Sequence, residues 1–217
     1  MNTHSMLMQI CVAVLCMATV GLHAAKKNFN EVVLYALQSL AVVTLLADSY
    51  VSKGSVPLLL IVVLTFAVKV ILAPLFFTRL IKRHKLKFTV NTYTSVPGAL
   101  TVIALILLLV NSRVFAPLTN LVPTNHGYLA LTLALLLASI FLMVNRRGVL
   151  SQVVGVLSLE NSIVAFSVFA GLEQSAALQA GVVFDVLVWS IIAIVLVSMV
   201  YRHIGSLDVT AMKNLKD

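Results

Sequence analysis

Residues 56–78 read VPLLLIVVLTFAVKVILAPLFFT, an apolar run broken near its middle by one lysine, Lys69. A helix needs about 20 predominantly apolar residues to cross the hydrocarbon core of a bilayer, and this run is long enough. Such a run predicts a membrane-spanning helix. A charged residue at its centre predicts that one face of the helix meets protein or water rather than lipid.

The composition of the whole chain places it in the same class. The 217 residues are 61% hydrophobic and only 10% charged, and the mean hydropathy is +1.08. A soluble domain carries about 25% charged residues, so a large soluble core does not explain the deficit. The net charge of +8 could suggest nucleic-acid binding. We exclude that class because the basic residues lie in the gaps between apolar runs and do not alternate with aromatic residues.

Apolar runs of this kind recur along the chain, separated by short polar gaps. There are seven: 5–24, 31–48, 56–78, 95–112, 127–144, 149–171 and 176–200. The expected fold is therefore an all-α membrane protein with seven transmembrane helices, in which neighbours along the chain are antiparallel.

The distribution of Lys and Arg predicts the orientation, because cytoplasmic loops are enriched in both. Of the 15 such residues, 12 fall on one side of a seven-span topology. They are Lys26, Lys27, Arg79, Lys82, Arg83, Lys85, Lys87, Arg146, Arg147, Arg202, Lys213 and Lys216. Lys53 and Arg113 fall on the other side, and Lys69 falls inside a run. The N-terminus is expected outside and the C-terminus in the cytoplasm.

Three charged residues lie deep in the apolar runs: Lys69, Glu160 and Asp185, with the uncharged Gln38 at a similar place. Two residues equidistant from the turn of an antiparallel hairpin lie at one depth. Gln38 and Lys69 are equidistant from a turn at Lys53, and Glu160 and Asp185 from a turn at 171–175. We therefore expect two level pairs near mid-membrane.

Two interpretations of these residues remain open. Intramembrane charges usually mark ion or proton pathways, because burial makes the charged form costly and eases proton exchange. Alternatively, they are interhelical hydrogen bonds that hold the bundle together. Pro74, which cannot donate to the carbonyl of Val70, either opens a polar site near Lys69 or only shapes packing. Cys11 and Cys16 are expected to be inert, and no ligand pattern for a metal or cofactor is present.

The two hairpins look like copies of each other. In each, a basic pair precedes a helix with a polar residue, and Leu37-Gln38-Ser39 matches Leu159-Glu160-Asn161. The expected organisation is one bundle over 1–217 of two parallel three-helix units, separated by a linking helix. The units are 5–87 and the segment 127–217, which ends in a cytoplasmic tail, and the linking helix is 95–112.

The motifs that suggest a family are spread over the chain. They are Tyr35-Ala36-Leu37-Gln38-Ser39-Leu40, Lys69-Val70-Ile71-Leu72-Ala73-Pro74-Leu75, Glu160-Asn161, Asp185 and Ser206-Leu207-Asp208-Val209. In these the chain resembles component E of hydrogenase-4, a seven-span subunit of group 4 [NiFe] hydrogenases and formate hydrogenlyase-type complexes. Its last third is similar to subunit K of NADH-quinone oxidoreductase, although Asp185 stands where that family has glutamate, and Gln38 and Lys69 stand where acids would be expected.

This resemblance implies a non-catalytic subunit in the membrane arm of a complex I-related, energy-converting hydrogenase of a bacterial or archaeal plasma membrane. The [NiFe] centre and iron–sulfur clusters would belong to partner subunits, with a membrane anchor and antiporter-like subunits as neighbours. Glu160, Asp185, Lys69 and Gln38 would form part of a proton or cation relay. The alternatives are a purely structural anchor between membrane subunits and a subunit of a cation–proton antiporter.

Overall fold

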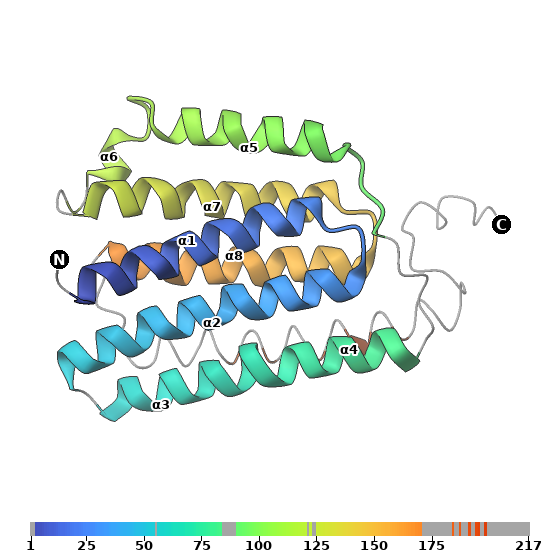
Figure 1. Cartoon of the computed structure of the whole chain (residues 1–217), viewed down its shortest axis with the longest axis horizontal. Helices are drawn as coiled ribbons and strands as arrows, with labels where there is room; N and C mark the ends of the chain where they lie inside the picture. Colours follow the sequence, from blue (N-terminus) through green and yellow to red (C-terminus); the bar gives the residue numbers. More distant parts are fainter. Residues whose placement is uncertain are drawn as a thin grey trace.

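The computed structural model describes residues 3–54, 56–83, 90–120, 122 and 125–170, together with six helical positions, Phe184, Leu187, Ile191, Ile194, Val195 and Ser198. These residues form helices and their connections (Figure 1). The helices are α1 (Thr3–Ala24), α2 (Asn28–Lys53), α3 (Val56–Thr65), the π-helical segment η1 (Phe66–Leu72), α4 (Ala73–Arg83), α5 (Val96–Val110), α6 (Ala116–Thr119), α7 (His126–Asn145) and α8 (Val149–Phe169).

Five helical stretches within this part of the chain are long and apolar enough to cross a membrane. They are Ser5–Ala24, Asn28–Ser52, Leu58–Lys82, His126–Asn145 and Val149–Phe169. Each coincides with one of the apolar runs, so the expected all-helical membrane class is confirmed. The run 95–112 becomes α5, whose 15 residues extend about 22 Å. The run 176–200, which contains Asp185, lies outside the described residues except at the six helical positions.

The second helix is longer than its apolar run. The run 31–48 predicted a short span, whereas α2 covers Asn28–Lys53 and includes the polar residues at both ends. Glu31 lies in the first turn, where a carboxylate interacts favourably with the helix dipole. At the other end Gly54 adopts a left-handed conformation with φ of 65°, and its N–H bonds to the carbonyl of Tyr50. The acidic first turn and the Gly54 cap at the C-terminal end therefore both favour a helix longer than hydropathy alone predicts.

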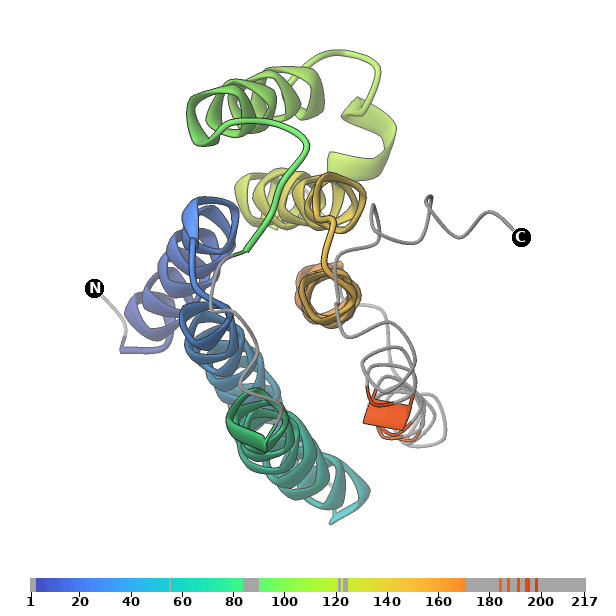
Figure 2. The ribbon, with the colours of Figure 1, turned by 90° about the vertical axis from the view of Figure 1, so that its right-hand side faces the viewer.

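The helices lie side by side, with α2 and α8 at the centre of the bundle. Figure 1 shows α1 and α2 as one antiparallel hairpin and α7 and α8 as another, and α2 and α8 run in the same direction. Seen end-on in Figure 2, α5 lies at one edge of the bundle. The consecutive helices α3, η1 and α4 (56–83), called here the α3–α4 rod, lie at the opposite edge. The spans of α2, α7 and α8 are more deeply buried in the bundle than those of α1 and of α3 to α4.

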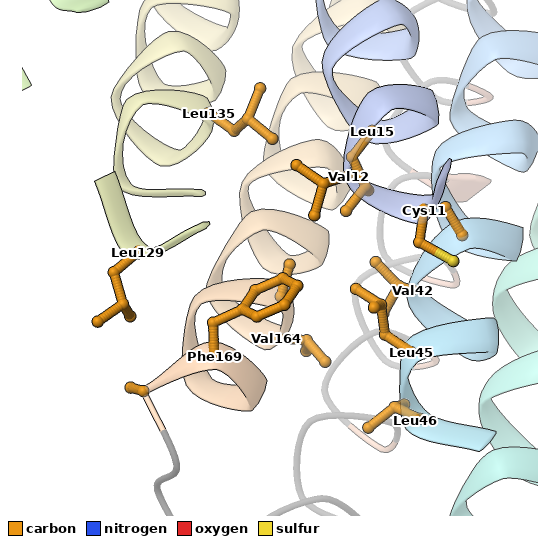
Figure 3. Close-up of a cluster of buried hydrophobic side chains, with 13 residues drawn as sticks. Cys11, Val12, Leu15, Val42, Leu45, Leu46, Leu129, Leu135, Val164 and Phe169 are labelled. Carbon is orange, nitrogen blue, oxygen red and sulfur yellow. The ribbon is translucent and has the colours of Figure 1, made fainter. Parts of the chain in front are cut away.

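A tight apolar cluster joins four of these helices (Figure 3). Leu15 of α1, Leu45 of α2, Leu129 of α7 and Ala165 of α8 are each fully buried in it. Because lipid is as apolar as these side chains, close packing and not exclusion of water holds them together. Cys11 is also packed in this cluster and Cys16 lies against it, and both thiols are free.

Three loops meet at one end of the bundle, called here the basic end. They are residues 25–27, 90–95 and 146–148, and backbone hydrogen bonds connect them. The Val90 N–H donates to the Lys26 carbonyl at 2.9 Å. The Tyr93 N–H donates to the Asn145 carbonyl at 3.0 Å, and the Arg147 N–H donates to the Asn91 carbonyl at 3.1 Å. The Arg147 guanidinium also lies 4.5 Å from the centre of the Tyr93 ring. Two pairs of the predicted topogenic residues, Lys26 with Lys27 and Arg146 with Arg147, therefore share one end.

Close contact between α7 and α8 depends on Gly155. A Cβ added at this glycine would lie 2.9 Å from Cα of Met143, so the backbones approach too closely for any larger residue. Small residues allow this kind of approach in membrane helix pairs.

We predict that Gly155→Ala lowers the free energy of unfolding by about 1–3 kcal/mol, because the added methyl group overpacks against the Met143 backbone. Thermal unfolding of the detergent-solubilised chain measures the effect. Gly127→Ala is the matched control, because a Cβ there meets nothing within 4 Å. Equal melting temperatures for the two variants would contradict the close approach of α7 and α8.

Candidate functional site

Lys69 lies at the middle of the α3–α4 rod and is only 1% exposed. It follows Val56 by 13 residues and precedes Arg83 by 14, which places it about 20 Å from either end. Its ammonium cannot reach the end of the helix from there. Instead, Nζ donates to Oδ1 of Asn161 at 3.1 Å and lies 3.6 Å from a carboxylate oxygen of Glu160.

The π-helical segment η1 carries Lys69, and Pro74 follows it. The N–H of Ala73 bonds to the carbonyl of Val68, five residues earlier, which is the π-helical pattern. Continued by one residue, this register sets Pro74 against the carbonyl of Lys69, and proline has no N–H to donate. In the π-helical register it is therefore the carbonyl of Lys69 that Pro74 cannot serve, whereas in an α-helical register it would be the carbonyl of Val70.

Asn161 of α8 connects the lysine to α2. Its amide oxygen accepts from Lys69, while its amide nitrogen donates to Oγ of Ser39 at 3.0 Å and to Oε1 of Gln38 at 3.4 Å. Because an amide has one acceptor end and one donor end, these contacts fix its orientation. Asn161 thus presents its negative end to the ammonium.

Gln38 extends the network to α1 and α7. Its amide nitrogen donates to the hydroxyl oxygens of Thr19 at 2.9 Å and Ser158 at 3.0 Å. Ser139 of α7 then lies 3.0 Å from Ser158 and 3.2 Å from Ser162, measured between hydroxyl oxygens. We call this set the central polar cluster: Thr19, Gln38, Ser39, Lys69, Ser139, Ser158, Glu160, Asn161 and Ser162.

Glu160 is the most exposed ionisable member of the cluster, with 13% of its side chain accessible against 1% for Lys69. The pair is neutral as a whole when both groups are charged, and it is also neutral after a proton passes from the ammonium to the carboxylate. In a poorly polar interior, changing the net charge of a site costs a large free energy, because the new charge is poorly solvated. Moving a proton within the pair leaves the net charge at zero and avoids that cost. The arrangement can therefore hold or transfer a proton.

The structure brings together three of the four residues singled out from the sequence: Gln38, Lys69 and Glu160. The expected level pair of Gln38 and Lys69 takes another form, because Lys69 contacts Asn161 and Glu160 of α8, and Asn161 links it to Gln38. Asp185 lies outside the described residues. Within the described ranges, no group of three His, Cys, Asp or Glu side chains could hold a metal ion.

Comparison with known proteins adds nothing to this geometry. No protein-family model, curated protein or solved structure matches the chain.

A second polar cluster, near the basic end, centres on Arg146. From the sequence this residue has only a topological role at a loop, but the structure buries it completely. Its Nη2 lies 3.2 Å from a carboxylate oxygen of Glu31, whose other oxygen accepts from the Ser151 hydroxyl at 2.6 Å. The guanidinium also donates to the carbonyls of Leu22 and Ala25. We call Glu31, Arg146 and Ser151 the basic-end cluster.

Arg146 thereby satisfies the carbonyls at the C-terminal end of α1 from a position after α7, and it holds the first turn of α2. Burial lowers the pKa of the guanidinium from its ordinary value, and the Glu31 carboxylate opposes that shift. The ordinary pKa of arginine lies so far above neutral pH that Arg146 keeps its charge. Arg146 therefore connects three helix ends: the C-terminal ends of α1 and α7 and the first turn of α2.

Sequence reasoning missed Asn161, the hydroxyl groups and the pairing of Glu31 with Arg146. One signal was present for α8: Ser158, Asn161 and Ser162 are spaced by three and four residues, which places them on one helix face. A polar stripe within an apolar helix indicates a protein-facing side. Nothing comparable marks Glu31 and Arg146 as partners, because they lie 115 residues apart.

We predict that Asn161→Leu lowers the free energy of unfolding by about 2–3 kcal/mol, because the buried Lys69 ammonium and Ser39 lose a hydrogen-bonding partner. Thermal melting of the purified chain in detergent tests this. Asn111→Leu is the control, since Asn111 is exposed and bonds only within its own helix. A loss below about 0.5 kcal/mol for Asn161→Leu would show that the ammonium does not need the amide.

For the basic-end cluster, Arg146→Met leaves the Glu31 carboxylate buried without its cation, so we predict a loss of about 3–5 kcal/mol in unfolding free energy. Adding Glu31→Gln removes the stranded charge and recovers a part of that loss. A double-mutant cycle followed by thermal unfolding measures the coupling. Arg147→Ala, which removes only the contact with Tyr93, serves as the control and costs about 1 kcal/mol or less. Additive losses in the cycle would disprove the pairing.

Proposed function

We propose that this chain is a non-catalytic membrane-arm subunit of a complex I-related, energy-converting hydrogenase-type complex, and that its central polar cluster is part of a proton or cation relay. The observation that carries the proposal is a fully buried lysine, Lys69, held 3.6 Å from Glu160 at the middle of a bundle of membrane-length helices. Intramembrane ionisable residues are costly to insert and usually serve ion or proton transfer.

The contacts around the pair suit a relay. A proton on the Lys69 ammonium and a vacant site on the Glu160 carboxylate lie close enough to exchange with little movement. Hydroxyl groups, which both donate and accept, line the cluster from α1, α7 and α8. The partial exposure of Glu160 gives the pair a route to the edge of the described bundle.

The topology that we propose has seven spans, with the N-terminus outside and the C-terminus in the cytoplasm. Five membrane-length helices support it, as does the shared end of the loops that carry Lys26, Lys27, Arg146 and Arg147. In this topology α5 is the fourth span and 176–200 the seventh. The two three-helix units remain a prediction, although α2 and α8 meet through residues that the repeat makes equivalent, Ser39 and Asn161.

The type of complex is inferred from the motif resemblance to component E of hydrogenase-4. The [NiFe] centre and iron–sulfur clusters then belong to partner subunits, and antiporter-like subunits and a membrane anchor adjoin this chain in a prokaryotic plasma membrane. A purely structural role has an observation in its favour too: the central polar cluster links five helical segments through hydrogen bonds. In that case its side chains hold subunits together and carry no proton.

The test compares Glu160→Gln, Lys69→Met and Asp185→Asn in the assembled complex. Membrane vesicles that contain each variant are supplied with hydrogen or formate, and electron transfer and proton uptake are recorded together. We predict that electron transfer persists while coupled proton uptake falls at least tenfold, because the neutral side chains cannot exchange a proton. Asp48→Asn, a carboxyl-to-amide change outside the cluster, should keep the wild-type ratio.

Two other outcomes decide against the relay. Wild-type uptake in all three variants means that the central polar cluster carries no ion. Dissociation of the complex on a native gel, with uptake lost only in proportion, supports the structural anchor. Ion exchange by the chain in liposomes without any partner would favour an antiporter subunit.

A further inference from the structure

His23 is buried near the end of α1, between the two polar clusters. Its side chain is 1% exposed, and its ring stacks on Phe141 of α7 with the centroids 5.4 Å apart. The ring nitrogen Nε2 lies 3.1 Å from the backbone carbonyl of Ala138. Neither the sequence motifs nor the relay proposed above includes this residue.

The contact with Ala138 fixes which form of the imidazole is present. A carbonyl oxygen only accepts, so Nε2 must carry a hydrogen. In the neutral ring Nδ1 is then a lone pair, and no hydrogen-bond partner for it is found among the residues that the structure describes. Buried polar atoms are normally satisfied, so an unpartnered nitrogen inside a membrane bundle requires an explanation. A lone pair of this kind is a proton acceptor.

The position of His23 connects the clusters on both sides. Thr19, a member of the central polar cluster, precedes it by one helical turn, about 6 Å along α1. On α7, Ala138 is the neighbour of Ser139, another member. Toward the basic end, the carbonyl of the preceding residue, Leu22, accepts from Arg146. A single water molecule spans a gap of one helical turn between polar groups.

We propose that Nδ1 of His23 is the proton-accepting step between the basic end and the central polar cluster, an inference that rests on the relay function proposed above. In the uptake step, a hydronium ion at the basic end gives a proton to Nδ1 and becomes water, and an N–H bond forms at Nδ1 while Nε2 keeps its hydrogen bond to Ala138. In the release step the Nδ1–H bond breaks, and the proton passes to water beside Thr19. The neutral ring is restored, and no electron is transferred.

The charges around the ring favour transit over storage of the proton. Arg146, which lies between α7 and α8, is a fixed positive charge that acts on the ring, and Glu31 of α2 is its partner. The contacts of the ring on α7 are with Phe141 and the Ala138 carbonyl, which carry no charge. An imidazolium at His23 would stand near the Arg146 guanidinium, and like charges repel. A proton bound there is therefore readily released.

The direct test is nitrogen NMR of the full chain, labelled with [15N]histidine and reconstituted in lipid bilayers. We expect one ring with a protonated Nε2 and an unprotonated Nδ1 at high pH, and a change at Nδ1 alone as the pH falls from about 9 to about 3. His23→Gln identifies the signal, because the variant lacks that imidazole. Glutamine is chosen because its amide can still donate to the Ala138 carbonyl. An Nδ1 signal that never changes over this range overturns the proposal, whatever the Glu160 variant does.

The functional test uses the assembled complex in vesicles. His23→Gln should lower coupled proton uptake at least fivefold while electron transfer persists, and His126→Gln, at the opposite end of α7 and exposed, should not. Wild-type uptake in His23→Gln overturns the proposal even if Nδ1 titrates. A normal Glu160→Gln variant with a titrating Nδ1 and a slowed His23→Gln would instead refute the role of Glu160 and leave His23 as an ion-carrying residue.

Discussion

A lysine ammonium in the interior of a helical bundle needs partners, and the centre of this structure is built to supply them to Lys69. Glu160 provides a compensating charge and Asn161 a fixed dipole. Each partner imposes a requirement on another element. Asn161 must be held by Gln38 and Ser39, and Gln38 by Thr19 and Ser158. The relative positions of α1, α2, η1 and α8 thus follow from one buried charge.

The basic-end cluster also pairs buried polar and charged groups, but at the end of α1 and not at mid-helix. The last turn of a helix has too few N–H donors for its carbonyls, and at the end of α1 the carbonyls concerned are those of Ala25 and of Leu22, which also accepts from the Ala25 N–H at 3.3 Å. Arg146 supplies the donors, but its own charge then needs a carboxylate, which Glu31 provides. Ser151 in turn satisfies the second oxygen of Glu31. Two networks, one about the middle of the helices and one at their ends, therefore fix the register of the two hairpins.

The apolar runs predicted the membrane class and the positions of the five long helices, because hydropathy over about 20 residues depends on composition alone. The charged residues within the runs predicted where a polar site lies, and Gln38, Lys69 and Glu160 do lie together. Their partners were not predictable in the same way. Pairing Lys69 with Asn161 requires knowing that η1 and α8 both pack against α2, although Lys69 and Asn161 are 92 residues apart in the chain. Hydropathy likewise predicts that Arg146 is exposed to solvent, because a sum over neighbouring residues contains no information about its contact with Glu31.

The short length of α5 has a consequence for the membrane around it. At 15 residues it extends about 22 Å, against roughly 30 Å for the hydrocarbon core of a bilayer. In the seven-span topology proposed above, acyl chains beside α5 must compress or tilt by several ångströms, and that deformation raises the free energy of the lipid. Because α5 lies at the edge of the bundle, the strained lipid lies along one flank (Figure 2). A helix from another chain that replaced this lipid would relieve the strain, so elastic energy of the bilayer itself favours association on that side.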